Sequence, residues 1–356
     1  MVTNGQLDTS DMFSERDLTQ NADVSGAKTI TVSDSSTIDI TEEGVYIVTG
    51  TAKNCTIRVN ADKEAKIQLV LDGVQITNDS SPAIYVVSAD KCFITTTSSG
   101  NTLSVTGQFT ADGDTNTDAV IYSKDDLVLN GLGTLTISST SNGISGKDDV
   151  KITGGTYTIT SAADAIEAND SIRISDGTFT IRTSKDGLHS ENDEDNTVGY
   201  IYISGGSFDI TASSDAVQGT TVVQIDGGTI DITASEGIEA TYVQINGGTI
   251  SISASDDGIN ASRKSSYSTP TVEFNGGMTT IVMGQGDTDA VDANGNIIVN
   301  GGTIDVTAQV SSFDYDGTAE YNGGTIIING TQTDSIPQSM MGGMGGMKGG
   351  FSRGMR

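Results

Sequence analysis

The chain has 356 residues, with 44 Gly, 3 Pro and no Trp, and its formal net charge is −29 at pH 7. This acidity excludes nucleic acid as a partner, because phosphate recognition needs basic patches, and it makes cations the natural ligands of the surface. No apolar run is long enough to cross a membrane, and residues 1–9 lack the basic and apolar regions of an export signal. The acidic, Thr/Ser/Gly-rich composition still favours an extracellular or cell-surface protein, so we expect a signal that this sequence lacks.

The two ends of the chain differ from its middle. Residues 1–27 lack strand periodicity and are expected to be irregular, and Thr29–Val48 has the pattern of an irregular first coil that caps an exposed edge. Residues 331–356 are predicted to be a disordered tail, because the Met/Gly-rich stretch can bury too little apolar surface to offset chain entropy. Cys55 and Cys92 could pair, but their separation is unknown at this level.

A repeated segment dominates residues 28–330. It reads two glycines, a Thr or Ser and then alternating apolar residues, as in residues 154–159. The second glycine of each copy is Gly133, Gly155, Gly177, Gly206, Gly228, Gly248, Gly277, Gly302 or Gly324, so the steps are 22, 22, 29, 22, 20, 29, 25 and 22 residues. Three short strands and three corners need roughly 20 residues. We therefore predict an all-β protein: a right-handed parallel β-helix, a solenoid of three-strand coils with about 22 residues per coil.

Each coil carries two further strands, such as residues 164–168 and 172–174. Period-two alternation in the three strands places Tyr157, Ile159, Ile166, Ile172 and Ile174 inside the coil.

The second strand of the coil repeats Asp, a small residue, an apolar residue and a polar residue. In register, the leading acids form one ladder and the residues three positions later form another. Stacked carboxylates repel, so they must take up a cation, accept backbone hydrogen bonds or bind protons. Corner capping is the ordinary role of a single leading Asp. Calcium fits where acids gather, since it prefers several oxygen ligands; the candidate ligands are Asp164, Glu167 and Asp186, then Glu236, Glu239, Asp256 and Asp257, and in a loop Glu191, Asp193 and Asp195.

Two insertions account for the 29-residue steps. One is the acidic loop around residues 191–195, which is equally explained as a solvated surface loop. The other adds Arg263, Lys264 and Tyr267 at the same corner of its coil. Together the two loops could flank a carbohydrate-binding face, with a basic residue pairing a uronate carboxylate and Tyr267 stacking on a sugar ring. A freely varying insertion is the alternative explanation.

Catalysis has weak support in the sequence. His189 is the only histidine, so no Ser-His or Cys-His pair can be assembled. A calcium-dependent polysaccharide lyase would need an Arg or Lys base, for which Arg173, Arg182 and Lys185 are weak candidates. These residues are also explained as partners of neighbouring acids, so we expect binding rather than catalysis.

The repeats, the segment 118–126 (DAVIYSKDD) and the Met/Gly tail together resemble the bacterial, largely clostridial, family of carbohydrate-binding domain-containing proteins. The resemblance implies a β-helix similar to that of pectate lyases, calcium in the acidic columns, binding of cellulose or acidic sugars, and a surface or lipoprotein location.

The sequence itself favours an acidic polysaccharide of the polygalacturonate type over flat cellulose, because it has no Trp and most aromatic residues fall at inward positions. We expect a monomer that binds polysaccharide with calcium as cofactor. The rival functions are a calcium-dependent lyase and a non-catalytic adhesin or stalk.

Overall fold

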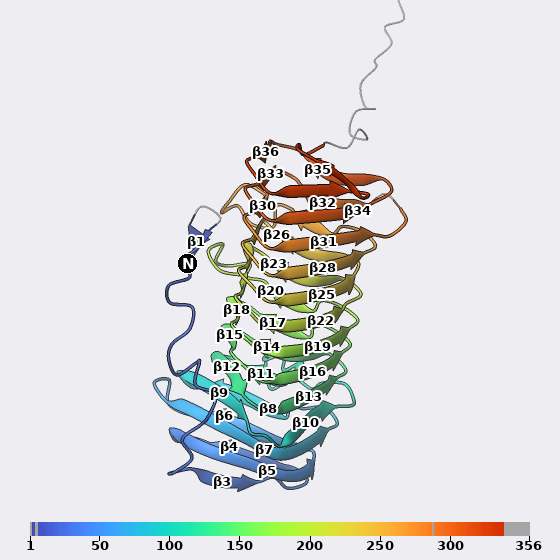
Figure 1. The fold of residues 1–356 in the computed structure, drawn as a ribbon. Helices are drawn as coiled ribbons and strands as arrows, with labels where there is room; N and C mark the ends of the chain where they lie inside the picture. The colour runs from blue at the N-terminus through green and yellow to red at the C-terminus, as the bar shows by residue number, and fades with distance from the viewer. Residues whose placement is uncertain (1, 4–5, 287, 338–356) are drawn as a thin grey trace, which may run out of the picture.

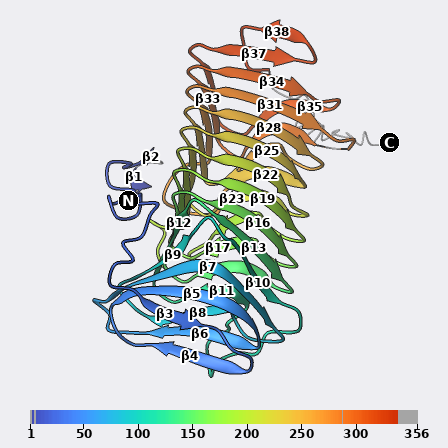
Figure 2. The ribbon, with the colours of Figure 1, turned by 60° about the horizontal axis from the view of Figure 1, so that its bottom comes forward.

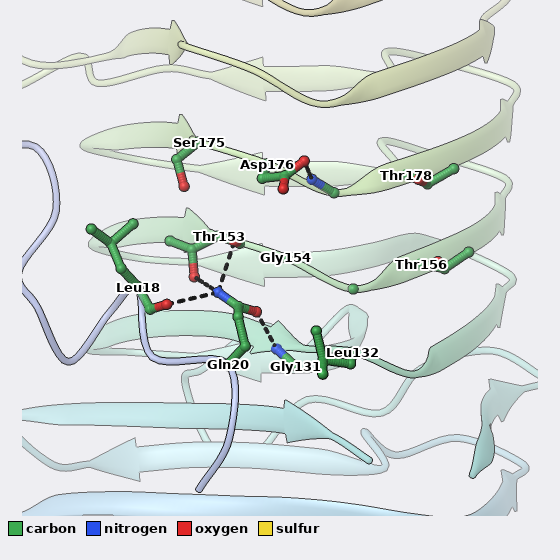
Figure 3. Close-up of a pocket in the computed structure, with 12 residues that line it drawn as sticks. Leu18, Gln20, Gly131, Leu132, Thr153, Gly154, Thr156, Ser175, Asp176 and Thr178 are labelled. Carbon is green, nitrogen blue, oxygen red and sulfur yellow. Dashed lines mark hydrogen bonds between the residues drawn. The ribbon is translucent and has the colours of Figure 1, made fainter. Parts of the chain in front are cut away.

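The computed structural model describes residues 2–3, 6–286 and 288–337, and all of its regular structure is β-strand. The chain winds upward as a column of stacked coils (Figure 1). In Figure 3 the chain passes from Thr153 at the left to Thr156 at the right while later coils lie above earlier ones, so the coils are right-handed. No helix among the described residues could span a membrane.

Three parallel ladders of strands form the three faces of the column. Face 1 follows the glycine pairs and contains β10 (Gly100–Val105), β13 (Thr134–Ser139), β16 (Thr156–Ser161), β19 (Thr178–Thr183), β22 (Ser207–Thr211), β25 (Thr229–Ala234), β28 (Thr249–Ala254), β31 (Met278–Met283), β34 (Thr303–Thr307) and β37 (Thr325–Ile328).

Face 2 follows face 1 in each coil. It contains β4 (Ser36–Ile40), β6 (Cys55–Asn60), β8 (Ile84–Ser88), β11 (Ala119–Ser123), β14 (Asn142–Gly146), β17 (Ile166–Ala168), β20 (Leu188–Ser190), β23 (Asp215–Gly219), β26 (Glu236–Ala240), β29 (Ile259–Ala261), β32 (Asp289–Ala293) and β35 (Ser311–Tyr315).

Face 3 completes each coil. It contains β9 (Lys91–Thr96), β12 (Asp126–Gly131), β15 (Asp149–Ile152), β18 (Ser171–Ile174), β21 (Tyr200–Ile203), β24 (Val222–Ile225), β27 (Tyr242–Ile245), β30 (Thr271–Phe274), β33 (Asn296–Val299) and β36 (Ala319–Tyr321).

The inward side chains make one continuous core through the column. The five residues predicted to point inward, Tyr157, Ile159, Ile166, Ile172 and Ile174, are all at most 1% exposed. Equivalent positions on successive coils stack on one another because the parallel register places like residues side by side. Phe179 lies between Tyr157 and Phe208, with ring centroids 5.2 Å and 4.6 Å apart. Cys55 and Cys92 are buried in this core as free thiols, so they do not form the disulfide that the sequence left open.

The glycine pairs mark the corners between faces 3 and 1. Gly277 has φ of +75°, and a Cβ there would lie 2.7 Å from the carbonyl oxygen of Gly248 in the coil below. A side chain is therefore excluded both by the left-handed backbone and by the close approach of the neighbouring coil. The recurring glycine pair in the sequence is thus a steric requirement of stacking these corners.

The N-terminal coils differ from the rest. β5 (Gly44–Lys53) and β7 (Lys66–Asn78) are long strands that each serve faces 3 and 1, and β3 (Lys28–Thr31) pairs with the first half of β5. The first half of β7 pairs with β9 and its second half with β10, where the two faces separate (Figure 2). At the other end, β38 (Thr331–Thr333) turns back antiparallel on β37 and covers part of its edge. The expected tail from residue 331 therefore begins with a short strand, and its part from residue 338 lies outside the described residues.

Residues 7–27, the N-terminal strap, cross the outer side of face 3 along the column (Figure 1). A short antiparallel pair, β1 (Val2–Thr3) and β2 (Gln6–Leu7), precedes the strap, and β2 lies near β24. Gln20 fastens the other end of the strap: its amide donates to the carbonyl oxygen of Thr153 at 2.9 Å and accepts from the backbone of Gly131 at 2.8 Å (Figure 3). Residues 1–27, expected to be irregular, include the short strands β1 and β2. The strap is docked on the column through contacts between residues more than a hundred positions apart in the sequence.

Candidate functional site

Two columns of polar residues run along the outer side of face 2, as the repeat predicts. The strand register aligns Asp215 with Glu236, and it aligns the second column residue by residue along successive coils. That column reads Glu167, His189, Gln218, Glu239, Asn260 and Asp292.

The leading acids cap the corners across coils. The carboxylate of Asp164 accepts the backbone N–H of Asp186 at 3.1 Å, and Asp186 does the same for Asp215 at 3.0 Å. Asp257 accepts the N–H of Asp289 at 3.2 Å. One oxygen of each of these acids is therefore structural, and only the other is available to a cation, a basic side chain or a proton.

The first gathering of acids, cluster 1, is Asp164, Asp186 and His189, all buried. Lys185 places its Nζ 2.8 Å from Asp164 Oδ2 and 3.7 Å from Asp186 Oδ2. Burial acts to raise the pKa of Asp164, but the hydrogen bonds from His189 and Lys185 outweigh it and lower that pKa. Burial acts to lower the pKa of His189, but the hydrogen bond and charge of Asp164 outweigh it and raise that pKa. Cluster 1 thus carries its own positive charge.

The second gathering, cluster 2, is Asp215, Glu236 and Glu239, whose oxygens lie within 4.8 Å of one another. Lys264 Nζ lies 2.7 Å from Glu239 Oε2 and is the cation that the described residues supply to this cluster. Burial and the charge of Glu236 raise the pKa of Asp215 to about 8. Burial and the charge of Glu239 likewise raise the pKa of Glu236. Three carboxylates share one lysine, so cluster 2 either holds protons or binds an added cation.

Without a cation, stability is expected to depend on the protonation of Asp215. Its pKa rises from an ordinary 3.8 to about 8 on folding, so between these values the folded chain holds a proton that the unfolded chain has released. Stability therefore falls as pH rises through this window. Asp215→Asn cannot ionise and should reduce the slope. Urea unfolding at several pH values within the window, with chelator present, measures this; equal slopes for both proteins would contradict the assignment.

A cavity of about 340 Å³ lies beside cluster 2. Its walls are the two insertions, residues 191–199 between β20 and β21 and residues 262–270 between β29 and β30. The loops touch, because Asn196 Nδ2 donates to Ser266 Oγ at 3.2 Å. Gln218 and Lys264 line the cavity and both contact Glu239, at 2.9 Å and 2.7 Å. The cavity is therefore a polar cleft of mixed charge with an under-neutralised acidic cluster at its edge.

The structure brings together some of the acids predicted as metal ligands. Asp164 joins Asp186, while Glu167 pairs instead with Lys147 at 3.4 Å. Glu236 and Glu239 come together with Asp215, which the sequence analysis did not place in a cluster although it occupies the same column. Exposed Asp256 lies outside both clusters, and burial raises the pKa of its neighbour Asp257 to about 7.

The candidate site residues of the two inserted loops lie in different places. Glu191, Asp193 and Lys264 line the cavity, and Glu191 also lies 3.4 Å from His189 Nε2. Asp195 caps its own loop by accepting the N–H of Thr197. Arg263 is exposed outside the cavity lining, and Tyr267 packs against an apolar cluster on face 3.

The three weak catalytic candidates lie in three different places. Lys185 pairs with Asp164 of cluster 1. Arg182 is on the exposed side of face 1, paired with Asp209 at 2.6 Å, and Arg173 is on face 3, paired with Asp149 at 2.7 Å. Each of them is therefore engaged with a different acid.

The column, its inserted loops and the polar cleft between them define the class of a parallel β-helix with a polar cleft on its surface. A sequence profile of the family described as "carbohydrate-binding domain-containing protein" matches residues 34–290, and this chain belongs to that family. A protein of that description from Acetivibrio thermocellus is 38% identical over 122 residues, 33% of this chain and 43% of the relative, so the match spans less than half of that relative.

A solved structure also shares the fold. It is described as the polysaccharide lyase-like protein from C. thermocellum, a gadolinium derivative, and is 32% identical with a TM-score of 0.57. The match covers 60% of this chain and 93% of that one. The resemblance expected from the repeats and tail is thereby confirmed.

Proposed function

We propose that this chain binds an acidic polysaccharide of the polygalacturonate type outside the cell, together with calcium and without cleaving it. The observation that carries the proposal is the cleft between the two loops, with cluster 2 at its edge. Asp215, Glu236 and Glu239 are the residues that would hold the ion, and hard oxygen ligands in flexible arrangement are what calcium prefers.

Charge supports a bridging cation. A chain of net charge −29 repels a polyuronate, and a bound divalent ion would neutralise cluster 2 and offer a positive point to the sugar carboxylates. An ion that takes Glu239 would also release Lys264, which lines the cleft, to pair with a uronate.

The lyase alternative has less support in the site. Burial acts to lower the pKa of Lys185, but the hydrogen bond to Asp164 outweighs it and raises that pKa. Lys185 is therefore protonated at neutral pH and cannot serve as a base. Arg182 and Arg173 are held in ion pairs on other faces.

Calorimetric titration with oligogalacturonate tests the proposal. We expect binding in calcium, loss of binding in chelator, and at least a tenfold weaker affinity for Glu236→Gln, because one missing charge-assisted contact is worth about 1.5–3 kcal/mol. Asp231→Asn, on the exposed side of face 1, is the matched control and should bind as the wild type does. If chelator and Glu236→Gln both leave the affinity unchanged, the ligand binds elsewhere on the chain. If no glycan binds, an adhesin or stalk is favoured.

Incubation of the protein with polygalacturonate and calcium separates binding from lyase activity. We expect no rise in the absorbance of unsaturated uronides, since Arg173, Arg182 and Lys185 are held in ion pairs with acids outside cluster 2. Steady product formation that Lys185→Ala abolishes would establish the lyase function.

A further inference from the structure

An aromatic surface lies on the outer side of face 3, beneath the strap. Tyr200 and Tyr202 project from β21, and Tyr242 projects from β27 two coils further along. Val222 on β24 lies between Tyr200 and Tyr242 in the same column. These residues form one apolar cluster with Met12, Leu7 and Phe13 of the strap, and Tyr267 packs against its edge. Tyr200, Tyr202 and Tyr242 are therefore exceptions to the inward positions at which most aromatic residues fall.

The column itself holds these rings. Tyr202 donates its hydroxyl to Asp226 at 2.9 Å, and Tyr242 donates to Glu273 at 2.7 Å. The guanidinium of Arg173 lies 5.3 Å from the ring centroid of Tyr200. Asp226, Glu273 and Arg173 all belong to the column, so the rings would keep their positions if the strap moved away.

The strap is fixed unevenly. Its half from Ser14 to Gln20 is anchored by Asp17, which is 1% exposed and pairs with Lys91 at 3.3 Å, while Asn130 donates to the carbonyl oxygen of Thr19 at 3.1 Å. Its half from Leu7 to Phe13 has one buried residue, Met12.

Within the described chain, no backbone hydrogen bond joins residues 7–13 to the column. Their contacts are made by side chains: Met12 Sδ accepts the hydroxyl of Tyr200 at 4.0 Å, and the ring of Phe13 lies 6.4 Å from that of Tyr202. Thr9 is a further side-chain partner of Tyr202. The contacts of this half with the tyrosines are therefore separate from the anchor at Asp17.

We propose that residues 7–13 are a displaceable cover over a second carbohydrate-binding surface made by Tyr200, Tyr202 and Tyr242. Pyranose rings stack on tyrosine faces, and rings fixed by hydrogen bonds lose little freedom when they bind. The ligand class is a neutral glycan such as a β-linked glucose chain, because Asp226 and Glu273 beside the rings would repel a uronate. The inference rests on the proposed function only for the carbohydrate class of ligand; it needs neither calcium nor cluster 2.

Calorimetry with cellohexaose in chelator tests the cover, using the full chain. Met12→Ser with Phe13→Ser should raise the affinity about tenfold, because apparent affinity scales with the fraction of chains whose surface is open. Leu18→Ser is the matched control: Leu18 is an exposed strap residue away from the tyrosines, and its replacement should change nothing. Adding Tyr202→Ala and Tyr242→Ala to the loosened strap should remove the gain.

Acrylamide quenching of tyrosine fluorescence shows directly whether the cover has opened, and Met12→Glu is a second way to open it. Increased quenching without any gain in cellohexaose affinity would overturn the proposal, as would unchanged quenching in both strap variants. Oligogalacturonate titration of the same proteins keeps the two proposals distinct. If the strap variants gain no affinity for cellohexaose but still bind oligogalacturonate in a calcium-dependent way, only the cover is overturned. If they gain affinity for cellohexaose but show no calcium-dependent binding of oligogalacturonate, only the function of cluster 2 is overturned.

Discussion

Replacing Phe179 by alanine is expected to lower the free energy of unfolding by about 3–5 kcal/mol, the usual cost of truncating a buried aromatic residue. Phe179 is 1% exposed and stacks between Tyr157 and Phe208, so its loss opens a void that two neighbouring coils share. Urea unfolding measures the change.

Thr178→Ala on the same strand is the control, because Thr178 is exposed on the outer side of face 1. It should stay within about 0.5 kcal/mol of the wild type. Equal effects of the two substitutions would mean that the stacked rings do not support the column.

Calcium is expected to raise the melting temperature through cluster 2. An ion that binds only the folded chain stabilises it by about 2.7 kcal/mol at 100 times its dissociation constant. Asp215→Asn with Glu236→Gln should abolish this gain, because amides keep the hydrogen bonds but not the charge.

Asp164→Asn with Glu167→Gln is the matched comparison, because the sequence alone assigns calcium to those acids. Lys185 and Lys147 already pair with them, so this variant should keep the calcium-dependent gain. If this variant alone loses the calcium-dependent gain, the ion binds at cluster 1 instead. If the wild-type melting curves in calcium and in chelator are identical, the acids serve only as corner caps.

The repeat predicts the column and its register because each coil is built alike. The glycine pairs and alternating apolar residues require the corners and the core, and the same register aligns Glu167, His189, Gln218 and Glu239. The column could also have identified Asp215 as a neighbour of Glu236, since they occupy equivalent positions.

What separates the two clusters could not be predicted from the repeat. Cluster 1 is neutralised by Lys185 at a corner, whereas among the residues that the structure describes cluster 2 has only Lys264, from an insertion. The reach of such side chains depends on loop conformation, which the repeat does not fix. The docking of the strap could not be predicted from the sequence either, because residues 1–27 have no periodicity and Met12 packs on Tyr200 at a separation of 188 residues.

A glycan array probed with the full chain, once in calcium and once in chelator, tests the central claim most directly. The account predicts signals on polygalacturonate-type glycans in calcium that disappear in chelator, since cluster 2 would supply the bridge between two acidic molecules. Signals on acidic glycans that persist in chelator, or no signal on any glycan in either condition, would contradict it.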